Sequence, residues 1–379
     1  MLKKTPLSHV ELSKINLIHN IKQFRNLAKK GTKFSVAIKG NAYGHGQNEV
    51  AKILEPYVDY FQVNSVEELK LLRKISKKKA FVFGYISKTD LLKAIKLDCI
   101  LAVFSFEQIK HISAMAEMCK VVQEIHLPVD AHLGREGFLI KELSSLFRKI
   151  KKCKYVKVSG IYAHFANIED IANLIYAQKQ IKEYEKALKL AEKLDFKNLQ
   201  THISATSGIL VYEKGTGIHP LIRLGIGVYG MWPSKHLRFI YENSKFKLKP
   251  VLSWKTKIAQ VKILPKGSFV GYGLTYITKK KTKIAVIPQG YADGFNRSLS
   301  NKGEVLIKGA RCKIVGRVSM NMFTVDVSHL KNVKAENEVV MIGRQGKEEI
   351  TAEENARKLH TINYEITTRI SSLLPRIIV

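Results

Sequence analysis

The feature that most constrains the fold is a repeated alternation of short β-branched runs and longer amphipathic runs between about residues 34 and 230. Each short run is followed by a polar turn, and the next run has helical periodicity. Parallel strands need long crossovers, which helices supply, so eight such units predict a (β/α)8 barrel. The eight strands centre near Val36, Phe61, Val82, Leu101, Ile125, Val158, His202 and Arg223.

Several helices between these strands can be placed. The segment Ser65-Val66-Glu67-Glu68 has the form of a capping box, in which the serine and the last glutamate each bond a backbone N–H group. Apolar residues follow it at helical spacing. Further helices are expected over residues 106–119, 140–150 and 171–194.

After about residue 240 the pattern changes to short strands separated by turn signals. Strands are expected at 251–264, 283–288, 304–308, 312–315, 323–327 and 338–342, with one helix at 351–359. The expected fold class is therefore α/β, with an N-terminal barrel domain at 1–240 and a mostly β C-terminal domain at 241–379. A segment at 7–12 can add a strand to either domain, so about the first 12 residues can belong with the C-terminal one.

Charge and cysteine content limit which binding partners, metal sites and cellular compartments can be expected. The net charge of +32 raises the question of nucleic acid, but the basic residues are spread along the whole chain without a recognition motif. Specific nucleic-acid binding is therefore not expected. The four cysteines lack metal-ligand spacing, so no metal site is predicted, and free thiols suit a reducing compartment. Without a signal-like segment or a run of about 18 apolar residues, we expect a cytoplasmic protein with no membrane span.

Polar side chains follow several predicted strands, at the end of the barrel where active residues gather. Lys39 closes the first strand, where burial lowers the pKa of an amine and suits it to Schiff-base chemistry. Arg223 closes the eighth strand and is followed by glycines that free backbone N–H groups. His164 follows the sixth strand and Arg135 the fifth, while hydroxyls after the seventh make a plausible phosphate cradle. Taken singly, a strand-end histidine is more often structural, and hydroxyl clusters also cap helices.

Four motifs, in this order along the chain, carry a resemblance: 37–46 (AIKGNAYGHG), 223–230 (RLGIGVYG), 290–294 (GYADG) and 315–320 (VGRVSM). With them the chain resembles the alanine racemase family of fold-type III enzymes, which use pyridoxal 5′-phosphate. The resemblance covers essentially the whole chain. It implies an enzyme that interconverts L- and D-alanine by a two-base mechanism and supplies D-alanine for peptidoglycan.

The resemblance also implies roles for individual residues. Lys39 would hold the cofactor as a Schiff base and serve as one base, and Tyr272 of the other subunit would be the second base. His164 would pack near the pyridine ring and Arg223 would donate to its nitrogen, giving a network from Tyr272 through His164 to Arg223. The phosphate would be held by Tyr43, Thr206, Gly225, Ile226 and Tyr364. The substrate site would include Arg135, Tyr291 and Met320, so a homodimer with shared active sites is implied.

Three positions depart from the family pattern. Pro128 stands where the family often has a carbamylated lysine that holds Arg135, so we hypothesise that a bound anion such as chloride, or a neighbouring acidic or amide group, balances this arginine. Asn321 stands where many relatives have aspartate, and Thr206 replaces a usual serine. Other interpretations of the function therefore remain open. They are a racemase of serine, lysine or a broad set of amino acids, a pyridoxal-phosphate carrier protein, and a fold-type III decarboxylase.

Overall fold

The computed structural model describes residues 6–379, so the first five residues of the expected N-terminal segment lie outside it. The contacts divide the chain into two compact units. The barrel unit holds Leu17–Gly40 and Val50–Lys249. The β unit holds the described residues up to Asn16, together with Asn41–Glu49 and Pro250–Val379.

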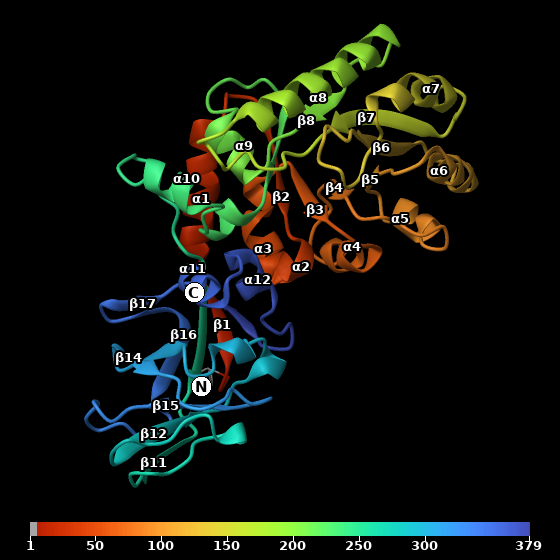
Figure 1. Cartoon of the computed structure of the whole chain (residues 1–379). Coiled ribbons are helices and arrows are strands. Elements are labelled where there is room, and N and C mark those ends of the chain that lie inside the picture. Colours follow the sequence, from red (N-terminus) through yellow and green to blue (C-terminus); the bar gives the residue numbers. More distant parts are fainter. Residues whose placement is uncertain (1–5) are drawn as a thin grey trace. The chain divides into compact units, whose positions relative to one another are not determined.

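Eight parallel strands build the barrel unit (Figure 1), hydrogen-bonded in the order β8-β7-β6-β5-β4-β3-β2-β9. Beyond β8, the carbonyl of Ser204 accepts a 3.1 Å hydrogen bond from the N–H group of Arg223 in β9, which brings the two ends of the sheet together. The predicted barrel is confirmed, because each expected strand centre falls in one of these strands. They are β2 (Lys33–Ala37), β3 (Tyr60–Val63), β4 (Ala80–Val82), β5 (Ile100–Ala102), β6 (Gln123–Pro128), β7 (Val156–Tyr162), β8 (Gln200–His202) and β9 (Leu221–Leu224).

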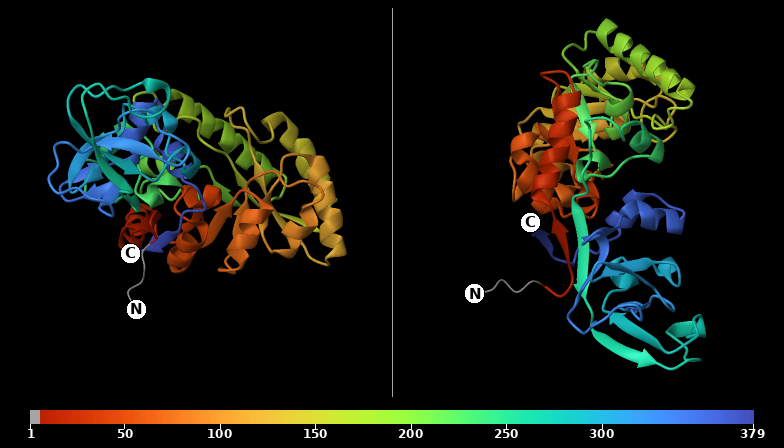
Figure 2. Two further views of the ribbon diagram at one scale, coloured as in Figure 1. Left: turned by 90° about the horizontal axis from the view of Figure 1, so that it is seen from below. Right: turned by 90° about the vertical axis from the view of Figure 1, so that its left-hand side faces the viewer.

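Helices cover the outside of these strands (Figures 1 and 2). Because the helices cover the outer face and the closed sheet encloses its own inner face, most strand residues are buried, as is usual in parallel sheets. The longer helices are α1 (Lys14–Leu27), α3 (Gln47–Leu54), α4 (Val66–Arg73), α6 (Phe106–Met118), α7 (Ile140–Ile150) and α8 (Ile175–Lys193). The shorter ones are α5 (Leu91–Lys96), α9 (Thr206–Val211) and α10 (Lys235–Ile240).

The start of α4 differs from the expected capping box. Ser65 caps the helix as predicted, since its hydroxyl accepts a 3.2 Å bond from the N–H group of Glu68. The Glu68 carboxylate, however, does not return to Ser65. It accepts bonds of 2.6 Å from the N–H group of Asn64 and 2.7 Å from that of Gly40. The predicted return bond, from the backbone N–H group of Ser65 to the Glu68 carboxylate, is therefore wrong. Glu68 instead holds the turn that follows β2.

The β unit contains two antiparallel-rich sheets. The larger runs in the order β14-β13-β16-β10-β1-β18, with β17 paired to β16, and the smaller in the order β11-β12-β15. The expected strand at 251–264 is two strands, because the chain changes sheet near Ile258. The strands are β10 (Leu252–Lys257), β11 (Gln260–Leu264), β12 (Thr282–Ile287), β13 (Glu304–Ile307), β14 (Ala310–Lys313), β15 (Phe323–Asp326), β16 (Glu338–Gln345), β17 (Glu348–Ile350) and β18 (Arg376–Ile378).

Strands near the two ends of the described chain pair with each other in the larger sheet. The strand β1 (His9–Leu12) lies antiparallel to β10, the red and green strands side by side in Figure 2, and it lies parallel to β18. Two helices complete the unit, α11 (Ala352–Leu359) and α12 (Asn363–Thr368). Thr351 caps α11 as predicted, with a 3.0 Å bond from the N–H group of Glu354.

One group of ion pairs ties the larger sheet to α11. Arg311 bonds the carboxylates of Glu304 at 3.2 Å, Glu348 at 2.8 Å and Glu354 at 2.8 Å. Lys358 bonds Glu304 at 3.0 Å and Glu354 at 2.9 Å. We call these five residues the Arg311 cluster. It joins β13, β14, β17 and α11, and because its members share partners, loss of the central arginine would leave three carboxylates close together.

Two further properties follow from the described residues. None of their helices is long and apolar enough to cross a membrane. Within residues 6–379, no three histidine, cysteine, aspartate or glutamate side chains are grouped so that they could hold a metal ion.

Candidate active site

Lys39 stands at the carboxyl end of β2, as predicted. The N–H group of Ile38 before it bonds the carbonyl of Gln62 in β3 at 2.9 Å, which holds the end of the strand. The turn α2 (Lys39–Tyr43) then takes an unusual backbone, with φ values of 60°, 52°, 54° and 53° from Gly40 to Tyr43. Left-handed residues other than glycine cost about 1–2 kcal/mol each, and such strain is concentrated at functional sites.

The surroundings of Lys39 favour a neutral amine. Its side chain reaches solvent, yet the protein atoms around it exclude much of the water. This desolvation lowers the pKa of the amine, and the positive charges of Arg135 and Arg223 lower it further. The carboxylates of Glu68 and Glu136 act in the opposite direction. A lysine of lowered pKa is a competent nucleophile and base.

Arg223 is buried inside the barrel near Lys39. Its Nη2 donates to the carbonyls of Ala163 at 2.5 Å and Ile203 at 2.9 Å. Its guanidinium carbon lies 5.6 Å from the ring centre of Phe83 and 5.2 Å from that of Tyr162. The Nε–H group of Arg223 is buried without a hydrogen-bond partner in the described chain. A buried donor left unpaired is costly and marks a place for an acceptor that is not part of the fold.

His164 follows β7, where Gln180 of α8 supports it by donating to its carbonyl at 3.1 Å. Burial lowers the pKa of the imidazole to about 3, and the charges of Arg223, Arg135 and Lys39 add to this effect. The ring is therefore neutral at pH 7. Its Nδ1 is buried and has no partner within residues 6–379.

Aromatic and imidazole rings are packed together in the barrel near Arg223. His126 Nδ1 and His202 Nε2 lie 2.9 Å apart, and Tyr162 stacks on His202 with ring centres 5.1 Å apart. The hydroxyl of Tyr162 is also buried without a partner among the described residues. Flat aromatic side chains therefore lie close to the buried guanidinium of Arg223.

Thr206 begins α9 and links the ends of β8 and β9. Its hydroxyl oxygen accepts 3.2 Å bonds from the N–H groups of both Gly225 and Gly227. Gly227 packs against the Phe24 ring and the Thr206 methyl so closely that a Cβ atom there would lie 2.5 Å and 2.6 Å from them. The short helix η2 (Ile226–Tyr229) follows. The hydroxyl and the glycine backbone thus meet at the strand ends where barrels often hold phosphate.

Arg135 lies in the loop after β6 and bonds its own neighbour. Its Nε and Nη2 donate to the two carboxylate oxygens of Glu136, the second bond measuring 2.6 Å. The side chain of Arg135 is 62% exposed and that of Glu136 is 25% exposed. Of the groups expected to balance Arg135, the structure provides the neighbouring acid. Pro128, which ends β6, is buried and brings no charge.

The remaining predicted residues belong to the β unit. The rings of Tyr43 and Tyr364 have centres 6.0 Å apart, and burial raises the pKa of Tyr43 to about 12. Gly44 packs so tightly on α12 that a Cβ atom there would be 1.8 Å from the carbonyl oxygen of Thr367. Arg376 holds the same turn, since its Nη2 donates to the carbonyl of Gly44 at 2.8 Å.

Three motifs of the β unit lie close together. The N–H groups of Tyr291 and Ala292 donate to the carbonyls of Ser319 at 3.1 Å and Met320 at 2.9 Å. A Cβ atom at Gly273, in the short turn η3 (Tyr272–Leu274), would meet the guanidinium of Arg317 at 2.8 Å. The side chains point outward: Tyr272 is 75% exposed, Tyr291 43% and Met320 56%.

The structure therefore collects the predicted residues in two sets. In the barrel unit are Lys39, Arg135, His164, Thr206, Arg223, Gly225 and Ile226, and in the β unit are Tyr43, Tyr364, Tyr272, Tyr291 and Met320. Sequence reasoning missed Glu136 and Tyr162, and took Glu68 only as a helix cap. The charge of Glu136 beside Arg135 was the one signal that could have pointed to it.

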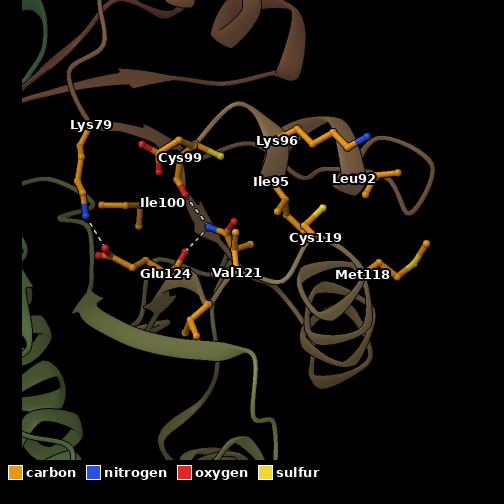
Figure 3. A pocket seen from close by; sticks show the side chains of 13 residues that line it. Lys79, Leu92, Ile95, Lys96, Cys99, Ile100, Met118, Cys119, Val121 and Glu124 are labelled. Atoms are coloured by element: carbon orange, nitrogen blue, oxygen red, sulfur yellow. Dashed lines mark hydrogen bonds and ion pairs between the residues drawn. The ribbon is translucent and has the colours of Figure 1, made fainter.

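A cavity of about 540 Å³ lies elsewhere, near the amino ends of β5 and β6 (Figure 3). Its lining includes Cys99, Met118 and Cys119, and an ion pair between Lys79 and Glu124 lies along it. None of the predicted site residues lines this cavity. Since active residues of such barrels lie at the carboxyl ends of the strands, it is not the active site.

Comparisons with known proteins agree with this geometry. The family model for the alanine racemase N-terminal domain matches residues 12–233, and that for the C-terminal domain matches residues 251–378. An alanine racemase of Leptospira interrogans is 34% identical over 385 residues, which cover 100% of this chain and 97% of that protein. One of Methanococcus maripaludis is 35% identical over 373 residues, covering 98% and 97%.

Solved structures give the same result. The alanine racemase of Bacillus anthracis with bound L-Ala-P has a TM-score of 0.92 and 31% identity, with 99% of this chain and 95% of that chain covered. A histidine racemase of Leuconostoc mesenteroides has a TM-score of 0.88 and 26% identity, with 99% of each chain covered. Both domain models match in order and together span nearly the whole sequence, so this chain belongs to the alanine racemase family.

Proposed function

We propose that this chain is a pyridoxal 5′-phosphate-dependent racemase that interconverts L- and D-alanine and so supplies D-alanine for peptidoglycan. The observation that carries the proposal is Lys39, an amine of lowered pKa at a strained strand end that faces the charges of Arg135 and Arg223. The family membership supports the same reaction, because relatives that are 34–35% identical over 97% of their length are named alanine racemases.

The residues of the chain fit the cofactor. The unpaired Nε–H group of Arg223 is a donor that suits an aromatic nitrogen, and an arginine there keeps its own proton at ordinary pH. The Thr206 hydroxyl, whose oxygen already accepts a bond from the N–H group of Gly225, keeps its own O–H group to donate to a phosphate, and we propose that the backbone of Gly225 and Ile226 lies beside that group. We propose that Tyr43 and Tyr364 complete the phosphate site and that His164 packs near the ring.

Racemisation requires that a proton leave one face of the substrate α-carbon and return to the other. When bound, pyridoxal phosphate withdraws electrons from that carbon and so acidifies its hydrogen. We assign the two proton carriers to Nζ of Lys39 and to the phenol oxygen of Tyr272. Two bases on opposite faces need little movement of the substrate. Arg135 would bind the substrate carboxylate, and Tyr291 and Met320 would line the substrate site.

A homodimer with shared active sites is part of this proposal. Tyr272, Tyr291 and Met320 are all exposed on the β unit, although the proposed mechanism needs each of them at a substrate. Exposed large side chains at a proposed site suit a surface that meets a second copy of the chain. The proposal therefore places Tyr272 of one subunit against Lys39 of the other.

A racemase of another amino acid is the second candidate. It is favoured by a specific observation, since a histidine racemase shares the fold at a TM-score of 0.88. Pro128 and Asn321 also depart from the alanine racemase pattern on the substrate side. The two candidates keep the same cofactor and the same bases, and differ only in the side chain that the site accepts.

The test is a chiral assay of racemisation with L-alanine, D-alanine and a panel including serine, lysine and histidine. Lys39→Ala is expected to abolish turnover, whereas Lys77→Ala, an exposed lysine in the barrel unit, is expected to leave it unchanged. Fast interconversion of alanine alone supports the first candidate, and preference for another amino acid supports the second. A wild-type protein that racemises none of the panel contradicts both.

A further inference from the structure

The mouth of the barrel unit carries an excess of positive charge. Lys39, Arg135 and Arg223 act on one another, since both arginines lower the pKa of the lysine. Arg223 is fixed by two carbonyls, but Arg135 is a long, mostly exposed side chain in a loop. An exposed arginine loses rotamer entropy when it binds a ligand, unless a partner already orders it.

The backbone that carries Arg135 is well defined. The Asp130 carboxylate accepts 2.9 Å bonds from the N–H groups of both Leu133 and Gly134. The N–H group of Asp130 donates to the carbonyl of Phe138 at 3.1 Å, and that of Phe138 donates to Pro128 at 2.9 Å. The loop from 130 to 138 is therefore closed on itself, with Arg135 and Glu136 between its fixed ends.

Glu136 holds Arg135 in a forked contact. Two N–H groups of the guanidinium, on Nε and Nη2, meet the two carboxylate oxygens, which is the strongest and most directional geometry for this pair. Arg135 lowers the pKa of the Glu136 carboxyl, so the glutamate is ionised at neutral pH. The contact uses one edge of the guanidinium and leaves Nη1 on the other edge for a ligand.

Among the described residues, no side chain other than Glu136 forms a hydrogen bond with the Arg135 guanidinium. Pro128, at the end of β6, has no charge to offer. The influence of Glu136 also extends beyond its neighbour, because its negative charge raises the pKa of Lys39 and acts on Arg223.

We propose that Glu136 is a positioning residue, which orders Arg135 so that its free edge can bind the carboxylate of an amino-acid substrate. This inference rests on the proposed function, because it assumes that Arg135 meets the substrate carboxylate. With a carboxylate built into the loop, the arginine needs no bound anion from solution. Glu136 thereby serves the reaction through Arg135 without touching the substrate.

The test compares the cofactor-loaded wild type with Glu136→Gln, Glu136→Asp, Arg135→Ala and the double variant Arg135→Ala/Glu136→Gln. Glu136→Gln keeps the size of the side chain and removes its charge. It is expected to raise KM for alanine about ten-fold, equivalent to about 1.4 kcal/mol, with kcat and the absorbance near 420 nm nearly unchanged. Glu136→Asp is expected to recover part of the loss. Glu117→Gln, an exposed glutamate of α6, is the matched control and is expected to match the wild type.

The double variant tests whether Glu136 acts through Arg135. If it does, Glu136→Gln adds nothing to the effect of Arg135→Ala, whereas independent roles would multiply the two effects. The wild-type KM is expected to be the same in chloride and in chloride-free buffer. A second readout needs no turnover: with arginine labelled in ¹⁵N, the Arg135 Nε–H signal, assigned with Arg135→Lys, is expected to exchange faster with water in Glu136→Gln.

The outcomes are separable. Three results in an active wild type would overturn the role of Glu136 and leave the racemase proposal standing. They are a KM that Glu136→Gln leaves unchanged, a wild-type KM that depends on chloride, and effects of Glu136→Gln and Arg135→Ala that multiply in the double variant. If alanine is not the substrate but another amino acid is, the same comparison is made with that amino acid. A wild type that racemises none of the panel overturns the proposed function and this inference with it.

Discussion

His219 is expected to lower the stability of the folded protein at acidic pH, and replacing this one residue should remove its share of the loss. It is buried in the barrel unit, where its Nδ1 lies 2.9 Å from the hydroxyl of Thr201. Burial, helped by the charge of Arg223, lowers the pKa of its imidazole to about 4. The unfolded chain takes up the proton at about pH 6.5, so the folded state is penalised as the pH falls from 6.5 towards 4.

The size of this penalty follows from the two pKa values. At pH 7.5 the histidine is neutral in both states and costs almost nothing. At pH 5.5 only the unfolded chain binds the proton, which lowers the free energy of unfolding by about 1.4 kcal/mol. His219→Gln keeps a hydrogen-bonding side chain but cannot titrate. Between these pH values it should therefore lose about 1.3 kcal/mol less stability than the wild type.

Urea unfolding at pH 7.5 and 5.5, at fixed protein and cofactor concentration, measures the difference. His236→Gln, on an exposed histidine of α10, is the control and should keep the wild-type pH dependence. The total loss in the wild type will be larger, because burial also lowers the pKa of His126, His164 and His202. It is partly offset by Glu213, whose pKa burial raises to about 7. If His219→Gln loses as much stability as the wild type between the two pH values, the reasoning is refuted.

Three other perturbations test the packing. Arg311→Leu should lower the free energy of unfolding in urea by about 2 kcal/mol, since it leaves Glu348 without its partner and Glu304 and Glu354 with Lys358 alone at a partly exposed site; an unchanged midpoint would contradict this. Gly44→Ala should prevent formation of folded, yellow protein, because the alanine Cβ atom would lie 1.8 Å from the Thr367 carbonyl oxygen. A normal yield of yellow protein would contradict this and show that the turn can move. With a thiol reagent at pH 8, Cys99 and Cys312 should stay unmodified in the native protein, because burial raises the pKa of each thiol to about 12. Mass spectrometry of the peptides is the measurement, and reagent found on either cysteine would contradict the prediction.

The barrel was predictable because its signal is local. Each strand is a short β-branched run closed by a turn, and α7 has the bounds that its apolar spacing predicts. Lys39 and Arg223 were found in the same way, as charged residues where an apolar strand ends. The segments that were missed, such as α12 and β18, are too short to show a period, and only their tertiary partners define them.

The site was harder to predict than the fold. The left-handed turn after Lys39 depends on Glu68, which bonds Gly40 from 28 positions away, and no pattern near Lys39 reveals it. Tyr272 and Met320 came from the resemblance alone, because an exposed tyrosine or methionine in a turn has no physical signature of catalysis. The contact of Arg135 with Glu136 depends on side-chain geometry, which adjacency in the sequence does not determine.

The central claim is that Lys39 holds pyridoxal phosphate and shares the proton transfers with Tyr272. The most direct measurement is an absorbance scan near 420 nm, followed by a chiral racemisation assay on the wild type, Lys39→Ala and Tyr272→Phe, with Tyr85→Phe as the control at an exposed tyrosine. The account predicts a yellow wild type that racemises alanine, a Lys39→Ala variant without the 420 nm band, and a Tyr272→Phe variant that is yellow but nearly inactive. A wild type that takes up no cofactor, or a Tyr272→Phe variant as active as Tyr85→Phe, would contradict it.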